Sequence, residues 1–320
     1  MSATSFTKGL TEVGNGLYAY MQPNGSWGYS NAGLVTSGEH SMLVDTLYTL
    51  ALTQEMLDVM KAAVPAAASF DFLINSHADG DHTYGNQLLG DTPIIATERA
   101  ALDMATEFTP ESMRSLLANT ANMGAAGRFL DTIMGPFDFS GINLTLPTRT
   151  FTGTLRLEVG EKKVELIDVG PAHSPGDLIV YLPEDRVVFL ADLLFVGGHP
   201  AVWAGPISNW IAVCERVLGM DVDVVVPGHG PLTDKAGVRE FRDYLVYVEA
   251  ETKRLYEAGL TVEEAARTID LSPYAHWTDA ERILIAVDTT YRELAGDTSP
   301  RNRIAVFEGM GELYEASHTS

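Results

Sequence analysis

The densest group of metal-binding side chains in this sequence lies between residues 77 and 82. Two histidines, His77 and His82, and two aspartates, Asp79 and Asp81, occur within these six residues. Carboxylates this close together repel one another, and a partly buried charge requires a partner. The spacing therefore indicates that one divalent metal ion, or a pair of ions, neutralises the cluster.

Three later segments place another metal-binding side chain at the end of an expected strand. They are residues 170–177 with His173, residues 189–195 with Asp192, and residues 226–231 with His229. In each we predict a strand, then a turn, then the ligand. Functional sites are often built on loops held at strand ends, so we expect these segments to meet the first cluster.

In this order, the four segments resemble the metallo-β-lactamase-fold hydrolase superfamily over about residues 31–231. The resemblance implies a site for two divalent metal ions whose ligands are His77, Asp79, Asp81, His82, His173, Asp192 and His229. It implies that the first ion is bound by His77, Asp79 and His173, the second by Asp81, His82 and His229, and that Asp192 bridges them.

The sequence departs from the family pattern at one position, since Asp79 stands where the family has a second histidine. A carboxylate is a harder ligand than an imidazole, which shifts the expected preference from zinc toward iron or manganese. Flavodiiron proteins of the same superfamily have Glu at this position and bind iron. Both zinc and iron or manganese therefore remain open as the cofactor.

The predicted activity is hydrolysis by a metal-activated water, with Asp81 as the catalytic residue that orients the water and accepts a proton. We expect a small, moderately apolar substrate with an ester, lactone, thioester or similar bond. One alternative is a non-heme diiron oxidative enzyme on the same fold, which Asp79 favours. A second alternative is a catalytically silent binding protein.

Three further residues are candidates for the pocket or for contacts behind the ligands. Tyr84 either donates a hydrogen bond near the metals or packs in the core. Asp177 is expected in the turn after His173. His199 follows Asp192 closely and has either a pocket role or a loop role.

The surrounding pattern predicts an α/β (α+β) fold in which two sheets pack together with helices on the outside. The resemblance implies that this is an αββα sandwich of four layers, with the site between the sheets at one edge. Short apolar strands recur on both sides of the first motif, and helical spacing dominates after residue 233. We expect a catalytic domain over residues 1–232 and a helical C-terminal extension over residues 233–320 packed on the same domain.

Residues 104–150 differ from the rest of this domain, because they are rich in Met and Phe and are interrupted by Gly and Pro. We predict an inserted group of short helices. It forms either a packed subdomain, which could include the contact of a homodimer, or a cap over the site, for which flexible Met side chains are suited. The side chains concerned are Met104, Phe108, Met113, Met123, Phe129, Met134, Phe137 and Phe139.

The composition of the chain limits the classes of partner that we expect. The formal net charge of −22 disfavours nucleic acid. No apolar run is long enough for a membrane span. The first eight residues lack the features of a signal peptide, and the one cysteine, Cys214, excludes an internal disulfide, so we expect a cytoplasmic location.

Overall fold

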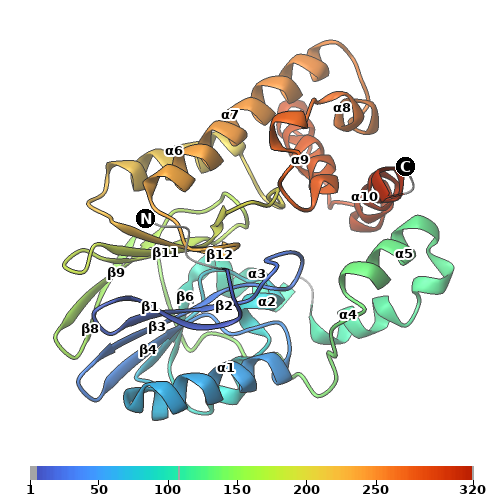
Figure 1. The fold of residues 1–320 in the computed structure, drawn as a ribbon. Helices are drawn as coiled ribbons and strands as arrows, with labels where there is room; N and C mark the ends of the chain where they lie inside the picture. The colour runs from blue at the N-terminus through green and yellow to red at the C-terminus, as the bar shows by residue number, and fades with distance from the viewer. Residues whose placement is uncertain (1–5, 107–108, 319–320) are drawn as a thin grey trace.

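A computed structural model describes residues 6–106 and 109–318 of the chain. Two β-sheets lie against each other, and helices cover the outer side of each (Figure 1). The predicted four-layer αββα sandwich is therefore confirmed. Phe108 and most of the N-terminal segment considered above lie outside the described residues.

The first sheet has seven strands, in the spatial order β1-β2-β3-β4-β5-β6-β7. Neighbours are antiparallel from β1 to β4 and parallel from β4 to β7. Helix α1 (Leu50–Ala63) covers its outer face, where Met56 and Met60 pack with Leu34 and Leu43. The strands are β1 Gly9–Gly14, β2 Leu17–Met21, β3 Ala32–Ser37, β4 His40–Val44, β5 Phe72–Ile74, β6 Ile94–Thr97 and β7 Arg149–Phe151.

The second sheet has five strands, in the order β12-β11-β10-β9-β8. Its inner face packs against the first sheet, with Val180 and Leu166 in one apolar cluster with Val35 and Val44. Helices α6 (Ile207–Gly219) and α7 (Lys235–Glu257) cover its outer face (Figure 1). The strands are β8 Thr154–Val159, β9 Lys162–Asp168, β10 Leu178–Leu182, β11 Val187–Phe195 and β12 Val224–His229.

Most of the remaining helices lie at one end of the sandwich (Figure 1). Helix α5 of the insertion packs against the last helix of the chain, where Arg128 pairs with Glu315 at 2.6 Å and the rings of Phe129 and Tyr314 are 5.6 Å apart. None of the described helices is long and apolar enough to cross a membrane. The α-helices not yet named are α2 Gly80–Thr83, α3 Glu98–Thr106, α4 Pro110–Leu117, α5 Gly124–Ile133, α8 Val262–Thr268, α9 Ile283–Ala295 and α10 Arg303–His318.

The sequence analysis missed two strands, and it wrongly placed two ligands after a turn. Strands β1 and β7 are edge strands with much exposed surface, so they lack the apolar pattern of a buried strand. Asp192 does not follow a strand in a turn, because β11 continues to Phe195. His229 does not follow a turn either, because β12 continues through Gly228 to His229. The ladder with β12 is irregular around Ala191, where φ is +45°, and this irregularity redirects the side chains inside the strand.

Candidate metal centre

Five elements bring the seven candidate ligands to one edge of the sandwich. The loop after β5 carries His77 and Asp79, and the short helix α2 carries Asp81 and His82. The loop between β9 and β10 carries His173, whereas Asp192 lies in β11 and His229 ends β12. Parallel pairing of β11 with β12 places the last two ligands side by side. The structure thus gathers every ligand that the sequence analysis named.

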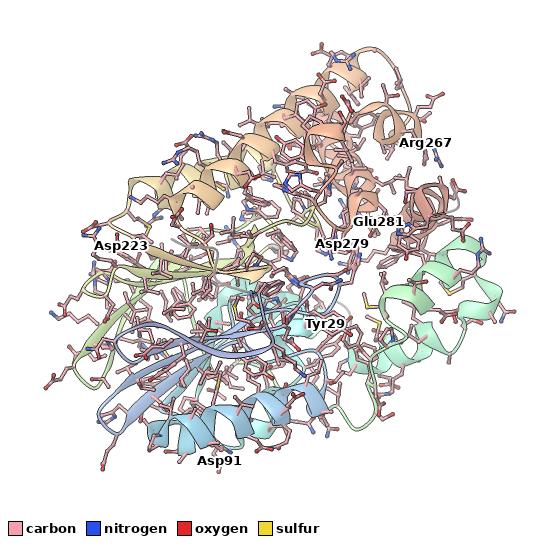
Figure 2. The ribbon with its side chains drawn as sticks, viewed as in Figure 1. Tyr29, Asp91, Asp223, Arg267, Asp279 and Glu281 are labelled. Carbon is pink, nitrogen blue, oxygen red and sulfur yellow. The ribbon has the colours of Figure 1, made fainter. Side chains whose placement is uncertain are left out.

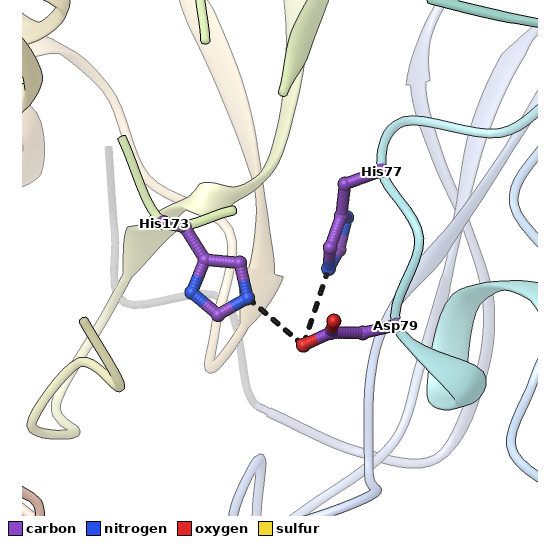
Figure 3. Close-up of side chains that lie close together, drawn as sticks. All are labelled: His77, Asp79 and His173. Carbon is purple, nitrogen blue, oxygen red and sulfur yellow. Dashed lines mark hydrogen bonds and ion pairs between the residues drawn. The ribbon is translucent and has the colours of Figure 1, made fainter. Parts of the chain in front are cut away.

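The ligand atoms form three overlapping groups, and within each group they lie within 4.8 Å of one another. In the group shown in Figure 3, Oδ2 of Asp79 is 3.1 Å from Nε2 of His173 and 3.8 Å from Nε2 of His77. The groups are His77, Asp79 and His173; Asp81, His82 and His229; and His77, His82 and Asp192.

Asp192 lies at the centre of the cluster and is 4% exposed. Its carboxylate oxygens are 2.9 Å from Nε2 of His82 and 3.3 Å from Nε2 of His229. They are 3.4 Å from Nε2 of His173 and 4.0 Å from Nε2 of His77. A Cβ at Gly228 would lie 2.1 Å from Oδ1 of Asp192, so only glycine allows β12 to pass this close.

The two histidines of the first motif are oriented by side chains of the first sheet. Asp45, directly after β4 and at φ +63°, accepts hydrogen bonds from Ser76 N and Oγ and from Nδ1 of His82. Because the Ser76 hydroxyl donates to Asp45, its oxygen accepts from Nδ1 of His77 at 2.9 Å. Both imidazoles therefore turn Nε2 toward Asp192.

The two later histidines are oriented by main-chain carbonyls instead. Nδ1 of His173 donates to the carbonyl of Ala201 at 2.7 Å, and Nδ1 of His229 donates to the carbonyl of Gly25 at 3.0 Å. The ring of Phe195 stacks on His229, with the ring centroids 5.0 Å apart. In both His173 and His229, Nε2 again faces the carboxylate of Asp192.

Among residues 6–106 and 109–318, three buried atoms at this centre have no hydrogen-bond partner: Nε2 of His77, Nε2 of His82 and Oδ1 of Asp192. The short contact between His82 and Asp192 lacks the geometry of a hydrogen bond. Buried polar atoms normally have partners, and imidazole nitrogens and carboxylate oxygens are metal donors. The residues present therefore fit divalent metal ions.

The cluster is strongly coupled electrostatically. Burial favours a neutral His77 and lowers the pKa of that imidazole. Burial acts in the same direction on His173 and His229, but the charge of Asp192 outweighs it and raises the pKa of each to about 9. Burial opposes ionisation of Asp79, yet the hydrogen bond from His173 outweighs it and lowers its pKa to about 2. Without metal, imidazolium and carboxylate neutralise each other, so metal binding must displace protons.

The ligands open into a cavity of about 460 Å³. One wall is apolar and includes Met104, Met113 and Met134 of the inserted segment, and another comes from α9 and α10 with the loop between them. Phe137 does not line this cavity, because it packs behind the wall against the ring of Tyr48 at 5.0 Å. The insertion is therefore both packed and part of the pocket.

The three additional candidates have different surroundings. Tyr84 lines the cavity and stacks on Tyr48, with ring centroids 5.7 Å apart. Asp177 accepts hydrogen bonds from Ser174 and from Ala172 N, so it stabilises the turn that carries His173. His199 does not line the cavity; its Nδ1 contacts the hydroxyl of Tyr244 at 2.8 Å, deep in the core.

The sequence analysis missed several residues around the site. Arg282 and Trp27 both line the cavity, and the guanidinium of Arg282 lies 4.1 Å from the ring centroid of Trp27. Trp27 and Arg282 are 255 residues apart in the sequence, and no motif surrounds either of them. The carbonyls of Gly25 and Ala201 left no signal either, because any residue supplies a carbonyl.

Comparison with curated proteins finds partial relatives. The chain is 28% identical over 160 residues to a linear primary-alkylsulfatase of Pseudomonas sp. (strain ATCC 19151), a match that covers 46% of this chain and 30% of that protein. It is 36% identical over 88 residues to the 2,4-dinitroanisole O-demethylase subunit alpha of Nocardioides sp. (strain JS1661), covering 26% of each. The matches thus span about a third or less of these relatives.

Solved structures show the same fold. A stereoselective inverting sec-alkylsulfatase from Pseudomonas sp. superposes with a TM-score of 0.67 at 17% identity, over 97% of this chain and 54% of that one. A metallo-beta-lactamase from Pontibacter korlensis gives 0.55 at 18% identity, over 75% of this chain and 99% of that one. The sequence model of the metallo-beta-lactamase superfamily matches residues 25–229. The chain belongs to the metallo-beta-lactamase superfamily, as its motifs predicted.

Proposed function

We propose that this protein is a metal-dependent hydrolase with a site for two divalent ions. The observation that carries the proposal is the convergence of four imidazole Nε2 atoms on the carboxylate of Asp192, with each Nδ1 already engaged by another partner. One ion would be held by His77, Asp79 and His173, the other by Asp81, His82 and His229, with Asp192 between them. Ions held there would lower the pKa of a water molecule and polarise the substrate.

The protein's own contribution to the reaction centres on Asp81. Burial raises the pKa of this carboxyl, but the charge of His82 and the hydrogen bond to His229 outweigh burial and lower it. Asp81 therefore stays ionised near neutral pH, as a group that orients water and accepts a proton must. Asp81 also lines the cavity, so its carboxylate is accessible to substrate.

The substrate that we propose is small and moderately apolar, with an ester, lactone, thioester or similar bond. The methionine wall supports the apolar part, since Met adapts its shape to varied ligands. Two relatives are named linear primary-alkylsulfatase and hydroxyacylglutathione hydrolase. Their names favour hydrolysis of an ester-type bond and add sulfate esters to the classes worth testing.

Asp79 supports a second candidate, a non-heme diiron oxidative enzyme. Its carboxylate lies between two imidazoles, where a hard oxygen donor favours iron or manganese over zinc. Hydrolysis remains the first candidate, because two curated relatives, an alkylsulfatase and a hydroxyacylglutathione hydrolase, have the names of hydrolases.

Metal analysis and a substrate panel test the proposal together. Protein purified without chelator is expected to hold two ions per chain and to cleave members of a panel of carboxylic esters, lactones, thioesters and alkyl sulfates. Chelation should abolish turnover, and zinc, manganese or ferrous iron should restore it. Asp91→Asn is a suitable control, since this exposed carboxylate lies on the surface away from the site (Figure 2).

Two results decide between the candidates. A chain that binds no metal even after reconstitution contradicts both. Iron with a visible spectrum that responds to oxygen, and no hydrolysis of any panel member, favours the oxidative enzyme instead.

A further inference from the structure

The C-terminal extension contacts the two segments that orient His173 and His229. We propose that this extension, helices α7–α10 with their connections, is a positioning device for these two ligands. The inference rests on the proposed metal centre, but not on the identity of the substrate.

His229 is connected to the extension through residues 25–27. Its Nδ1 donates to the carbonyl of Gly25. The next residue, Ser26, donates from its hydroxyl to Asp279 at 2.5 Å, and Trp27 Nε1 donates to Glu281 at 2.9 Å. Both acceptors belong to the extension and lie where it meets the N-terminal loop (Figure 2). The acceptor of His229 is therefore fixed on one side by the sandwich and on the other by the extension.

Arg282 adds a second connection to the same histidine. Its guanidinium lies 4.1 Å from the ring centroid of Trp27 and 5.5 Å from that of Phe195, and Phe195 stacks on His229. Its Nη1 also donates to the carbonyl of His199 at 2.9 Å. One side chain of the extension thus contacts both the loop that orients His229 and the ring that packs on it.

His173 is connected to the extension through residues 201–204. Its Nδ1 donates to the carbonyl of Ala201, and its own carbonyl accepts from Trp203 N and Ala204 N. Arg301 donates to the carbonyl of Trp203 at 2.7 Å, and Thr289 donates to the carbonyl of Val202 at 2.5 Å. Arg301 also donates to the Thr289 hydroxyl at 2.7 Å, which joins the two contacts.

The chemistry of these contacts favours positioning over simple packing. Arg282 is 2% exposed, and burying a guanidinium is costly unless it is paired. Its Nη1 donates to the carbonyl of His199 and its Nη2 pairs with Asp279 at 3.4 Å, whereas its Nε has no hydrogen-bond partner among the described residues. An extension that only covered apolar surface could do so with apolar side chains at lower cost. At the loop that orients His173, the donors Arg301 and Thr289 bond to the carbonyls of Trp203 and Val202. At the loop that orients His229, Ser26 and Trp27 donate to the carboxylates of Asp279 and Glu281. Directional hydrogen bonds fix the place of an acceptor, which apolar contacts do not.

Two conservative variants test the two connections separately. Thr289→Val keeps the side-chain shape but removes the hydroxyl that donates to Val202, and Ser26→Ala removes the hydroxyl that donates to Asp279. Stepwise cobalt titration of the metal-free full chain, followed by absorbance, gives a dissociation constant for each ion. Each variant should weaken one binding step by about three- to tenfold. This is less than the 10- to 100-fold loss for groups that contact metal-binding histidines directly, because the removed hydroxyl acts through the loop that carries the acceptor. The two variants should affect different steps.

Arg267→Gln is the matched control. Arg267 pairs with Glu312 at 3.0 Å on the exposed side of the same extension, so cobalt binding should be unchanged. Hydrogen exchange at residues 201–204 supplies a second readout and should accelerate in Thr289→Val alone.

The possible outcomes are distinguishable. Unchanged cobalt affinity in both variants, or equal weakening of both steps with a lower unfolding midpoint, overturns the positioning role and leaves the extension as scaffold. Absence of cobalt binding in the unmodified chain overturns the proposed metal centre itself.

Discussion

The two halves of the candidate site hold their histidines in different ways. His77 and His82 depend on Asp45 and Ser76, whose side chains follow β4 and β5, two paired strands of one sheet. His173 and His229 depend on carbonyls of Ala201 and of a loop far away in sequence. The first half carries its own support, whereas the second half takes its support from loops that the C-terminal extension contacts.

This difference shows what a compact motif can encode. A side-chain carboxylate supplies a negative charge and directed hydrogen-bond acceptors at the same time, so one such residue can help to orient two ligands. A carbonyl has no identity in sequence and must be placed by its neighbours. We therefore expect mutations in the first half to act locally, and mutations in the extension to act on the second half from a distance.

The largest effect is expected from Asp192→Ala, which removes the group shared by both halves. Four imidazole Nε2 atoms would lose their common carboxylate. Since losing even an indirect support costs 10- to 100-fold, we expect kcat/KM to fall by more than about 100-fold. Metal analysis should find both ions lost. If one ion stays firmly bound, the halves are independent sites and Asp192 does not join them.

The next effect tests the self-contained half. Asp45→Asn keeps a residue type that tolerates the positive φ at this position. The amide cannot accept from Ser76 and His82 together as the carboxylate does, so the metal affinity should drop by about 10- to 100-fold. Cobalt titration measures the loss. A loss no greater than that in Thr289→Val would remove the contrast between direct and indirect support.

The predictability of the molecule follows the same division. The strands around residues 77–82 could be predicted, because buried strands carry apolar runs and ligands at strand ends have marked types. The four-layer sandwich was predicted from the resemblance of these motifs to the superfamily. The edge strand β1 (Gly9–Gly14) could not, since half-exposed strands lack that pattern. Trp27 and Arg282 could not be paired, because their contact exists only after residues far apart in sequence have packed.

The surroundings of His199 could not be predicted from the sequence either. The titration of this residue allows a test of the second half by the pH dependence of stability. Burial, with the nearby charge of Arg282, lowers the pKa of His199 to about 4. The unfolded chain binds this proton near pH 6.5, so stability is present above that pH and is lost as the pH falls toward 4. From these values the loss at pH 5.5 is about 1.4 kcal/mol, or about tenfold in the folding equilibrium.

Urea unfolding of metal-free protein at pH 7.5 and pH 5.5 measures this loss. His199→Gln lacks the titrating group, so its stability should fall by about 1.4 kcal/mol less than that of the unmodified chain between the two values. Comparing the two proteins cancels the titration of other groups. Equal losses would mean that His199 is solvated or charged in the folded chain, and that the loop beside Arg282 is looser than the structure shows.

The smallest expected effect concerns the cavity wall, where the inserted segment and the extension face each other. Met113 lines the cavity, whereas Phe137 of the same segment packs behind it. Met113→Ala removes apolar contact with substrate, and at about 0.8 kcal/mol per methylene group this should raise KM by about four- to tenfold with little change in kcat. Phe137→Ala should instead lower the stability by about 3–5 kcal/mol.

The two variants separate the roles of the insertion. KM measured under conditions where both variants are folded should rise for Met113→Ala and stay near the original value for Phe137→Ala. If KM rises equally in both, the wall acts as one unit and its packing layer shapes the pocket as much as its surface does. If neither changes KM, the substrate lies against the extension, and substrate contact and ligand positioning then belong to the same half of the molecule.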